Sequence, residues 1–319
     1  MGKAAATLRA MRALVVGGSG FVGRNLTRFL TSEGQSVTVV DRIPDATGTF
    51  TGDFVQGDAQ DPNLLAAVIS QSKPDVVYHL AANSDISAGV ADASLDFGDT
   101  LMTTIALRQV ISKNPVKKLV FASSSAIFGA IDSPLGEVIE GFAEPASWYG
   151  RAKLASEYVL ESLAAEVPSM GILMVRFPNV VGPLATHGVI FDFVRKLRAD
   201  PSTLQVLGDG HQTKPYVHVS ELIEGIEFFN ALTQAGVKRV NIGPPDTVDV
   251  RGIANEVAEA MNLTPEILYQ DSPFGWPGDI PRYSFDTSQM RAQGFAIDTT
   301  SRSAVRLAAD QLALEIQAL

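Results

Sequence analysis

The sequence predicts an α/β protein in which a doubly wound parallel sheet is followed by a smaller α/β part. Short runs rich in Val, Leu and Phe are apolar without alternation, which is typical of parallel strands covered on both faces. Helix-like segments separate these runs, and this β-α-β-α order favours a doubly wound sheet. The 319 residues suffice for one large domain or two intimate domains with a buried core.

The first half of the chain supplies the expected sheet. Its strands are expected over 13–18, 36–41, 53–58, 75–81, 118–124 and 172–177. The intervening helices are expected over 23–34, 64–72, 94–114 and 148–165. Because helical segments separate most of these apolar runs, the strands are expected to run parallel.

The pattern loosens after residue 177. Turn-rich pieces appear at 178–183, 208–215, 243–245 and 272–281. Helix-like runs around 189–198, 219–233, 250–262 and 301–317 separate them. We expect one domain over 11–177, to which strands and a helix around 214–242 return, and a second domain mainly over 178–319.

Composition excludes several classes of function. The chain has no cysteine, which excludes disulfides, thiolate nucleophiles and zinc–thiolate sites and fits a cytoplasmic protein. The four histidines (His79, His187, His211 and His218) lack the spacing of metal ligands, so no metal site is expected. A net charge of −10 argues against general nucleic-acid binding. No apolar run approaches the ~20 residues that span a bilayer, so no membrane partner is expected.

Glycines mark a cofactor turn between the first expected strand and the first expected helix. In VVGGSGFVG (15–23), Gly17 permits a tight turn and Gly20 lets the backbone approach a pyrophosphate. Gly23 allows close packing of the helix. Glycines also fill ordinary turns, but the strand–turn–helix context is the one that dinucleotide binding requires. We therefore expect an NAD-binding Rossmann domain over 11–177 and a mainly substrate-binding domain over 178–319.

Carboxylates after the next two strands favour NAD. Asp41 lies 18 residues beyond Gly23, where it would accept hydrogen bonds from the adenosine ribose and repel the 2′-phosphate of NADP. Arg42 beside it could instead accommodate that phosphate, so NADP is the alternative. Asp58 ends the third expected strand and could reach the adenine amino group, or serve as a plain turn residue.

A tyrosine and a lysine four residues apart lie on one face of the helix expected over 148–165. The phenol of Tyr149 has a reference pKa of about 10, too high for a base at neutral pH. The ammonium group of Lys153 and the positive nicotinamide ring would both favour the phenolate and lower that pKa. Alone, such a pair would more often lie on the surface, but here it follows a cofactor turn and a strand that ends in serines.

Six motifs make the chain resemble the extended short-chain dehydrogenase/reductase family, particularly its NAD-dependent nucleotide-sugar epimerases and dehydratases. The resemblance runs from about Met11 to the C-terminus and is strongest to UDP-glucose 4-epimerase-like proteins. The motifs are GGSGFVG (17–23), HLAANSD (79–85), SSSAIFG (123–129), YGRAK (149–153), RFPNVVGP (176–183) and GDGHQTKPYVHV (208–219).

The resemblance implies a role for each residue of the site. The catalytic Ser or Thr of the family falls on Ser124, which would bridge the sugar hydroxyl and the Tyr149 oxygen, and Lys153 completes the catalytic set. A structural turn is the alternative for Ser123 and Ser125 and is favoured for Ser123. The residues expected at the cofactor are Gly17, Gly20, Phe21, Val22, Asp41, Arg42, Asp58, Ala59, Leu80, Ala81, Ala82, Ser123, Tyr149, Lys153 and Phe177. Those expected at the substrate are Ser84, Ser124, Ser125, Tyr149, Asn179, His187, Val189, Gln205, Lys214, Tyr216 and Arg282.

The residues after Ser124 narrow the expected reaction. Dehydratases of the family place an Asp-Glu pair there, whereas this chain has Ser125 and Ala126, which cannot act as acid or base. Hydride transfer alone remains, which suits a 4-epimerase working through a 4-keto sugar. The alternatives are an NAD(P)-dependent nucleotide-sugar reductase or dehydrogenase, and a dinucleotide-binding regulator without catalytic activity.

The substrate half departs from the family pattern at two places. Lys214 stands ahead of Tyr216 where many relatives carry an arginine, and a lysine neutralises a phosphate without bidentate geometry. An arginine usual before the late Gly-Asp pair is missing from FGWPGD (274–279), where Arg282 could substitute and Trp276 could stack on a base or sugar or pack in the core. The resemblance implies a nucleotide-sugar substrate, first a UDP-hexose, and a homodimer formed by the helices near 94–114 and 148–165.

Overall fold

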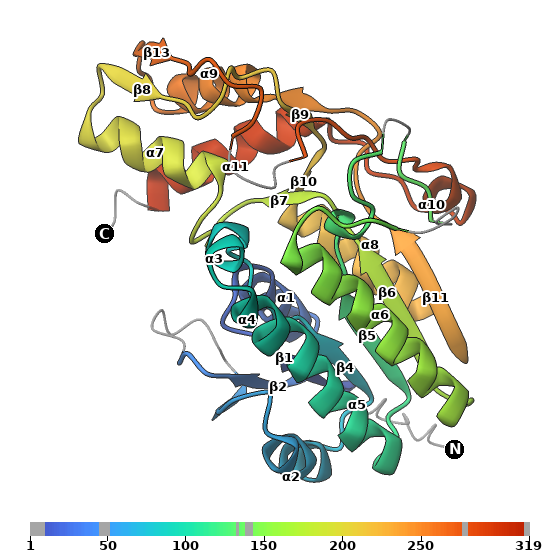
Figure 1. The fold of residues 1–319 in the computed structure, drawn as a ribbon. Coiled ribbons are helices and arrows are strands. Elements are labelled where there is room, and N and C mark those ends of the chain that lie inside the picture. Colours follow the sequence, from blue (N-terminus) through green and yellow to red (C-terminus); the bar gives the residue numbers. More distant parts are fainter. Residues whose placement is uncertain (1–9, 45–51, 132–133, 138–142, 276–279, 316–319) are drawn as a thin grey trace, which may run out of the picture.

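A seven-stranded parallel sheet forms the centre of the first part of the chain (Figure 1). The structure is a computed structural model, and it describes residues 10–44, 52–131, 134–137, 143–275 and 280–315. The strands stand in the order β11-β6-β5-β4-β1-β2-β3, and every neighbouring pair is parallel. Their bounds are β1 Arg12–Val16, β2 Ser36–Asp41, β3 Asp53–Gln56, β4 Val76–His79, β5 Lys118–Ala122, β6 Gly171–Arg176 and β11 Gly236–Asn241.

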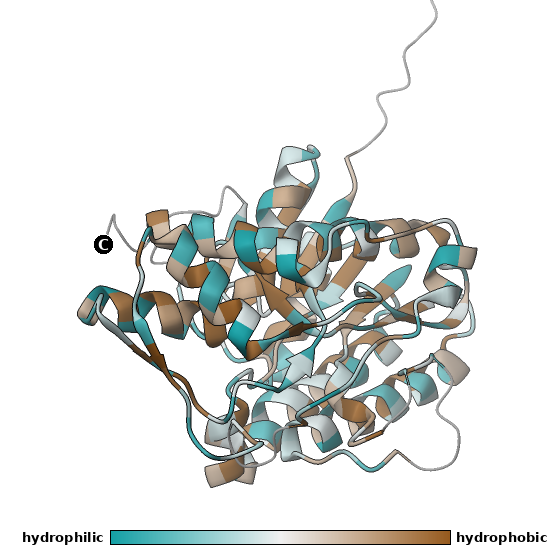
Figure 2. Cartoon of the chain, turned by 90° about the horizontal axis from the view of Figure 1, so that it is seen from above, coloured by the Kyte–Doolittle hydropathy of each residue, from teal (hydrophilic) through white to brown (hydrophobic). Residues whose placement is uncertain are grey.

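Helices cover both faces of this sheet, which explains why its strands are apolar at successive positions. One face packs against Leu26 and Leu30 of α1 (Phe21–Ser32) and against Leu222 and Phe229 of α8 (Val219–Leu232). The other face packs against α2 (Pro62–Ser72), α5 (Thr103–Lys113) and α6 (Trp148–Glu166). Figure 2 shows hydrophobic residues on the strands between these helical layers. The predicted doubly wound fold is confirmed.

The helix expected over 94–114 is interrupted in the structure. After α3 (Ile86–Ala91), the chain forms α4 (Ala93–Asp96), a π-helical segment η1 (Phe97–Met102) and then α5. The hydroxyl of Thr103 donates to the carbonyl groups of Asp99 and Thr100, and the hydroxyl of Thr104 donates to that of Thr100. Such side-chain bonds compete with the regular helical pattern, and π-helical turns often lie at functional sites.

The rest of the chain forms a second, smaller assembly of helices and two-stranded sheets. Its helices α7, α9 and α11 pack against one another around a separate apolar core. The short strands pair as β7 with β10 and β8 with β13 in parallel, and β9 with β12 antiparallel. The bounds are β7 Asn179–Val181, α7 Val189–Ala199, β8 Thr203–Gln205, β9 Thr213–Lys214, β10 Tyr216–His218, β12 Val248–Asp249, α9 Val250–Ala260, β13 Glu266–Leu268, α10 Ser288–Ala292 and α11 Ser301–Glu315.

The strand order places a binding crevice beside β1. The chain starts there, passes outward through β2 to β3, and then returns to β4 on the other side of β1. In open α/β sheets, ligands bind at the carboxyl ends of the strands where the order reverses in this way. The glycine turn after β1, the carboxylate at the end of β2 and the serines after β5 all lie at this edge.

Two further properties hold for the described residues. None of their helices is both long enough and apolar enough to cross a membrane. No group of three or more His, Asp or Glu side chains in these same ranges is arranged to hold a metal ion.

Candidate active site

A large cavity runs along the carboxyl ends of the strands and is closed from above by the smaller assembly. It has a volume of about 1100 Å³. Its lining joins the glycine turn, the end of β2, the loops after β4 and β5, the start of α6 and the segment from Phe177 to Lys196. Pockets for a single small ligand usually enclose about 300–1,000 Å³, so this cavity has room for a dinucleotide together with a second ligand.

The glycine turn fits the pyrophosphate of a dinucleotide. Gly17 has a φ of +88°, and a Cβ there would lie 2.5 Å from the backbone nitrogen of Ala81. A Cβ on Gly23 would lie 2.3 Å from the Gly17 carbonyl oxygen, so α1 packs directly on the turn. Gly20 lines the cavity, and its nearest atom would be 3.5 Å from an added Cβ. Backbone N–H groups at the start of α1 are therefore open to an anion.

Replacing Gly23 by alanine is expected to cost the protein most of its bound NAD. The new Cβ would meet backbone atoms of Gly17 and Gly18 that cannot move without reshaping the turn. The NAD content of the purified protein, measured by absorbance after denaturation, checks this. Gly98→Ala is the matched control, because its Cβ would come no closer than 3.8 Å to Gln60. Equal NAD content in the two variants would contradict the assignment of the turn.

The adenosine end of the cavity carries the carboxylates expected there. Asp41 accepts hydrogen bonds from the backbone nitrogens of Ser19 at 2.9 Å and Ile43 at 3.0 Å, which fix its position at the end of β2. Asp58 lines the same end and accepts from the Gln60 backbone at 2.9 Å. The other expected cofactor residues that line the cavity are Gly17, Gly20, Phe21, Val22, Arg42, Ala59, Leu80, Ala81, Ala82, Tyr149, Lys153 and Phe177.

The first two turns of α6 bring Tyr149 and Lys153 to the cavity. Ser147 caps the helix by accepting from the Gly150 backbone at 3.1 Å, so the helix starts at Trp148. The Lys153 Nζ lies 5.8 Å from the centre of the Tyr149 ring and donates to the carbonyl of Ala122 at 2.6 Å. The lysine therefore bridges the helix and the end of β5.

The protein groups around this pair act in opposite directions on the two pKa values. Burial raises the pKa of Tyr149 to about 12; a hydrogen bond with Ser124 lowers it, and the negative charge of Asp96 raises it. Burial lowers the pKa of Lys153 to about 7, although Glu157 opposes this shift. Among the protein's own groups, burial of Tyr149 outweighs the hydrogen bond from Ser124, and the lowering expected from Lys153 together with the nicotinamide ring stays a prediction.

The three consecutive serines after β5 have three different roles. Ser123 is fully buried and donates to Glu157 at 2.5 Å, away from the cavity. Ser124 lines the cavity, accepts from the Ala126 backbone at 3.1 Å and shares a hydrogen bond with Tyr149. Ser125 also lines the cavity and donates to the hydroxyl of Tyr283 at 3.2 Å. The middle hydroxyl is thus the one in contact with the tyrosine.

A buried ion pair lies behind the three serines and Lys153, on the side away from the cavity. Glu157 lies one turn beyond Lys153 on α6, and its carboxylate receives the Arg176 guanidinium through two hydrogen bonds at 2.9 and 2.7 Å. Both side chains are only 2% exposed. Because Glu157 also accepts from Ser123, the ion pair joins α6, the end of β5 and the end of β6.

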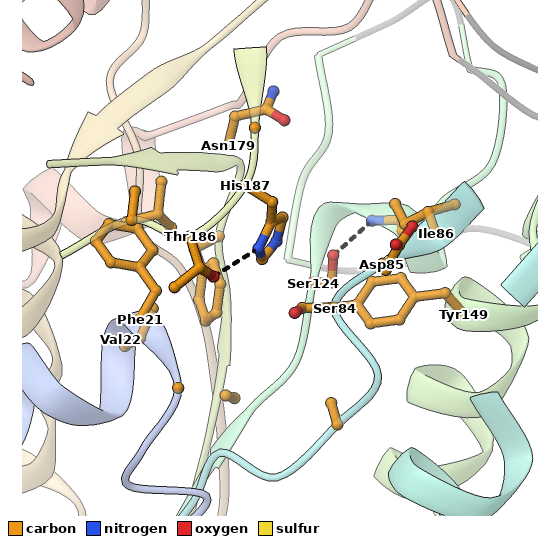
Figure 3. A pocket seen from close by; sticks show the side chains of 18 of the residues that line it. Phe21, Val22, Ser84, Asp85, Ile86, Ser124, Tyr149, Asn179, Thr186 and His187 are labelled. Atoms are coloured by element: carbon orange, nitrogen blue, oxygen red, sulfur yellow. Dashed lines mark hydrogen bonds between the residues drawn. The ribbon is translucent and has the colours of Figure 1, made fainter. Parts of the chain in front are cut away.

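The opposite wall of the cavity comes from the start of α1 and from the loop before α7. Figure 3 shows Phe21, Val22, Thr186 and His187 facing Ser124 and Tyr149 across the cavity. The Thr186 hydroxyl and the His187 Nδ1 lie 3.1 Å apart. The expected substrate residues that line the cavity are Ser84, Ser124, Ser125, Tyr149, Asn179, His187, Val189, Lys214 and Tyr216.

Three expected site residues do not line the cavity. The hydroxyl of Ser123 points to Glu157. Gln205 lies on the strand β8, where its carbonyl accepts a hydrogen bond from the Lys196 side chain. Arg282 forms an isolated β-bridge with Thr213. Ser123, Gln205 and Arg282 therefore lie next to the cavity, and their contact with a ligand stays a prediction. Trp276 lies outside the described residues.

Sequence reasoning missed Tyr283, whose hydroxyl lies beside both Ser125 and the Asn179 amide, 3.3 Å away. The chain brings it there from more than 100 residues beyond Asn179, and it is the direct neighbour of Arg282 in the sequence. Ser19, inside the glycine motif, was also missed; its position between two of the motif's glycines is a signal that could have found it.

The chain is similar to known proteins over most of its length. The chain matches the NAD dependent epimerase/dehydratase family over residues 13–243. The UDP-glucose 4-epimerase of Mycolicibacterium smegmatis is 27% identical over 296 residues, covering 88% of this chain and 91% of that protein. A crystal structure of a UDP-galactose 4-epimerase is 32% identical with a TM-score of 0.85, covering 96% of this chain and 100% of that one. The UDP-glucose 4-epimerase of Thermus thermophilus in complex with NAD is 28% identical with a TM-score of 0.83, covering 95% and 99% of the two chains. Since the family match extends over more than half of its length, the chain belongs to the NAD dependent epimerase/dehydratase family.

Proposed function

We propose that this chain is an NAD-dependent epimerase that inverts C4 of a nucleotide sugar, with a UDP-hexose as the substrate. The observation that carries the proposal is the joint placement of Ser124, Tyr149 and Lys153 at the cavity, with no acidic pair after Ser124. Ser125 binds Tyr283, and Ala126 has no ionisable group, so neither can expel water from the sugar. The UDP-hexose epimerases among the similar proteins support the same reaction.

The residues of the chain divide the proton chemistry among them. Tyr149, as phenolate, removes the proton of the sugar 4-hydroxyl. The Ser124 hydroxyl bridges the Tyr149 oxygen and the sugar 4-hydroxyl by hydrogen bonds. In its protonated form, which a neighbouring phenolate favours, Lys153 places a positive charge near Tyr149, and it anchors the start of α6 to Ala122. When bound, NAD supplies the hydride acceptor and donor, and its positive ring favours the phenolate that burial disfavours.

The cavity also supports the inversion itself. The intermediate 4-keto sugar has to present its other face before hydrogen returns to C4. The wall made by Phe21, Val22, Thr186 and His187 stands apart from the catalytic hydroxyls, so the sugar can turn between the two walls (Figure 3). Lys214 and Asn179 line the cavity on the side of the smaller assembly, where they would bind the diphosphate.

The proposal also assigns a ligand to each of the two domains and includes a homodimer. Residues 11–177, completed by α8 and β11 from the region 214–242, bind NAD, and residues 178–319 mainly bind the sugar nucleotide. The enzyme acts in the cytoplasm as a homodimer formed through the region 94–114 and α6. Exposed apolar side chains there, among them Met102 at 46% and Tyr158 at 63%, support this surface, and light scattering on the purified protein tests it.

The test of the reaction is proton NMR of the purified protein with UDP-glucose, UDP-N-acetylglucosamine and UDP-glucuronate in separate tubes, without added NAD. A new anomeric signal of the 4-epimer is expected in at least one tube. NAD that stays bound through purification distinguishes the epimerase from a dehydrogenase, which exchanges its cofactor with solution. No new signal in any tube, also after NAD is supplied, would contradict a UDP-sugar 4-epimerase.

A further inference from the structure

An ion pair spans the adenosine end of the cavity. Arg42 follows Asp41 at the end of β2, and its Nη2 lies 2.6 Å from the Oδ2 of Asp99. Asp99 belongs to the π-helical segment η1, 57 residues further along the chain, and both residues line the cavity. The pair therefore connects the strand that ends at the ribose site with the helix on the other side of the cavity.

The charges around Arg42 hold the guanidinium in this pair. The pKa of Arg42 is raised chiefly by its hydrogen bond to Asp99, and the charges of Asp58 and Asp41 add to this shift. The Arg42 carbonyl accepts from the side chain of Gln56 at 3.2 Å, which fixes the backbone. The side chains of Arg42 and Asp99 are 54% and 21% exposed, so the carboxylate is the better shielded of the two.

Arg42 is also the residue that could serve NADP. An arginine next to the acidic residue that ends β2 can accept the 2′-phosphate of that cofactor. The sequence from Ile43 to Gln60 contains no Lys or Arg, so no basic residue of the β2–β3 connection could replace it. The Nη2 of Arg42 donates to Asp99, so this pair competes with the forked contact by which an arginine holds a phosphate.

We propose that Asp99 is a cofactor-specificity residue, which excludes NADP by holding Arg42 away from the 2′-phosphate. The usual explanation needs Asp41 alone, because its carboxylate repels that phosphate. Here Asp41 has a cation beside it that would offset the repulsion, and Asp99 removes this cation from the ribose site. The inference rests on the NAD site proposed above and concerns how that site selects its cofactor.

Asp99→Asn is the decisive variant, because asparagine keeps the shape of the side chain and removes its charge. The protein is first freed of the nucleotide that it retains through purification and is then incubated with equal concentrations of NAD and NADP. After separation from free nucleotide, the bound fraction is measured by chromatography. The NADP:NAD ratio is expected to rise about tenfold, which is the usual effect of one charge-assisted hydrogen bond. Asp53→Asn, the same charge change at the opposite end of the neighbouring strand β3, is the matched control and is expected to leave the ratio unchanged.

The double variant Asp99→Asn with Arg42→Ala separates two explanations. If Arg42 carries the effect, the double variant returns to a low NADP:NAD ratio. A gain that persists without Arg42 would overturn the proposal, because the Asp99 charge itself would then repel the phosphate. An unchanged ratio in Asp99→Asn alone would also overturn it. Wild-type protein that binds neither nucleotide would instead remove the NAD site, and with it the proposed epimerase.

Discussion

Replacing Tyr149 by phenylalanine is expected to lower kcat by about a thousandfold, the usual scale of general acid–base catalysis. The variant loses the hydroxyl that takes the proton of the sugar 4-hydroxyl. Ser124 cannot replace it, because Ser124 is hydrogen-bonded to Tyr149 and would pass the proton on to it. The phenyl ring keeps its place above Lys153, so folding and NAD binding should persist. Epimerisation rate, bound NAD and thermal midpoint are measured on the same preparation.

Tyr158→Phe provides the matched control for this experiment. Tyr158 lies on the same helix α6 but is 63% exposed, and it does not line the cavity. It should therefore keep wild-type turnover. Ser124→Ala should give an intermediate loss, because the tyrosine remains while the bridge to the sugar is gone. Wild-type activity in Tyr149→Phe would show that another group transfers the proton.

Replacing Glu157 by alanine is expected to destabilise the protein by about 3–5 kcal/mol, because it leaves the Arg176 guanidinium buried without its counter-ion. Both side chains are 2% exposed, and two hydrogen bonds join them. Arg239 also lies at this carboxylate, with its Nε at 3.6 Å, and the charge of Glu157 acts on Lys153 as well. Arg239 keeps its ion pair with Glu161 at 3.0 Å when Glu157 is lost, whereas Arg176 loses the carboxylate that it is buried against.

Urea unfolding of the two variants Glu157→Ala and Glu166→Ala measures this effect. Glu166 ends the same helix and pairs with Arg108, but its side chain is 47% exposed, so its loss should cost about 0–1 kcal/mol. Changing Glu157 and Arg176 together to leucine and methionine should restore part of the stability, because no charge is then left buried. A loss below about 1 kcal/mol for Glu157→Ala would mean that water or another residue replaces the carboxylate.

Most of the sheet could be predicted because burial on both faces leaves a simple pattern in the sequence. The strand β2 spans Ser36–Asp41, as expected, and α6 begins at Trp148, as expected, because Ser147 caps it. The π-helical segment η1 could not be predicted, because it depends on which carbonyls the threonine hydroxyls reach. The edge strand β11 has few fully buried residues, so its apolar signal is weak.

The candidate site was predictable where local motifs position it and not where distant segments meet. The glycine turn and the Tyr149–Lys153 pair follow from spacing within one or two elements, and the resemblance to the family implied the role of Ser124. Tyr283 reaches Ser125 only through the packing of segments 158 residues apart. The direction of the Ser123 hydroxyl depends on Glu157 in another element, so its partner could not be predicted from the local sequence.

The position of β11 has a consequence for how the chain is made. When the first 177 residues have emerged from the ribosome, β1 to β6 are complete. One face of their sheet still lacks α8, and β6 has no neighbour on its outer side. Both are supplied only after the intervening segment, which includes β7 and α7, has emerged. Nascent chains of this protein therefore expose an apolar surface and an unpaired strand for the time needed to translate about 60 more residues, at ~5–20 residues per second.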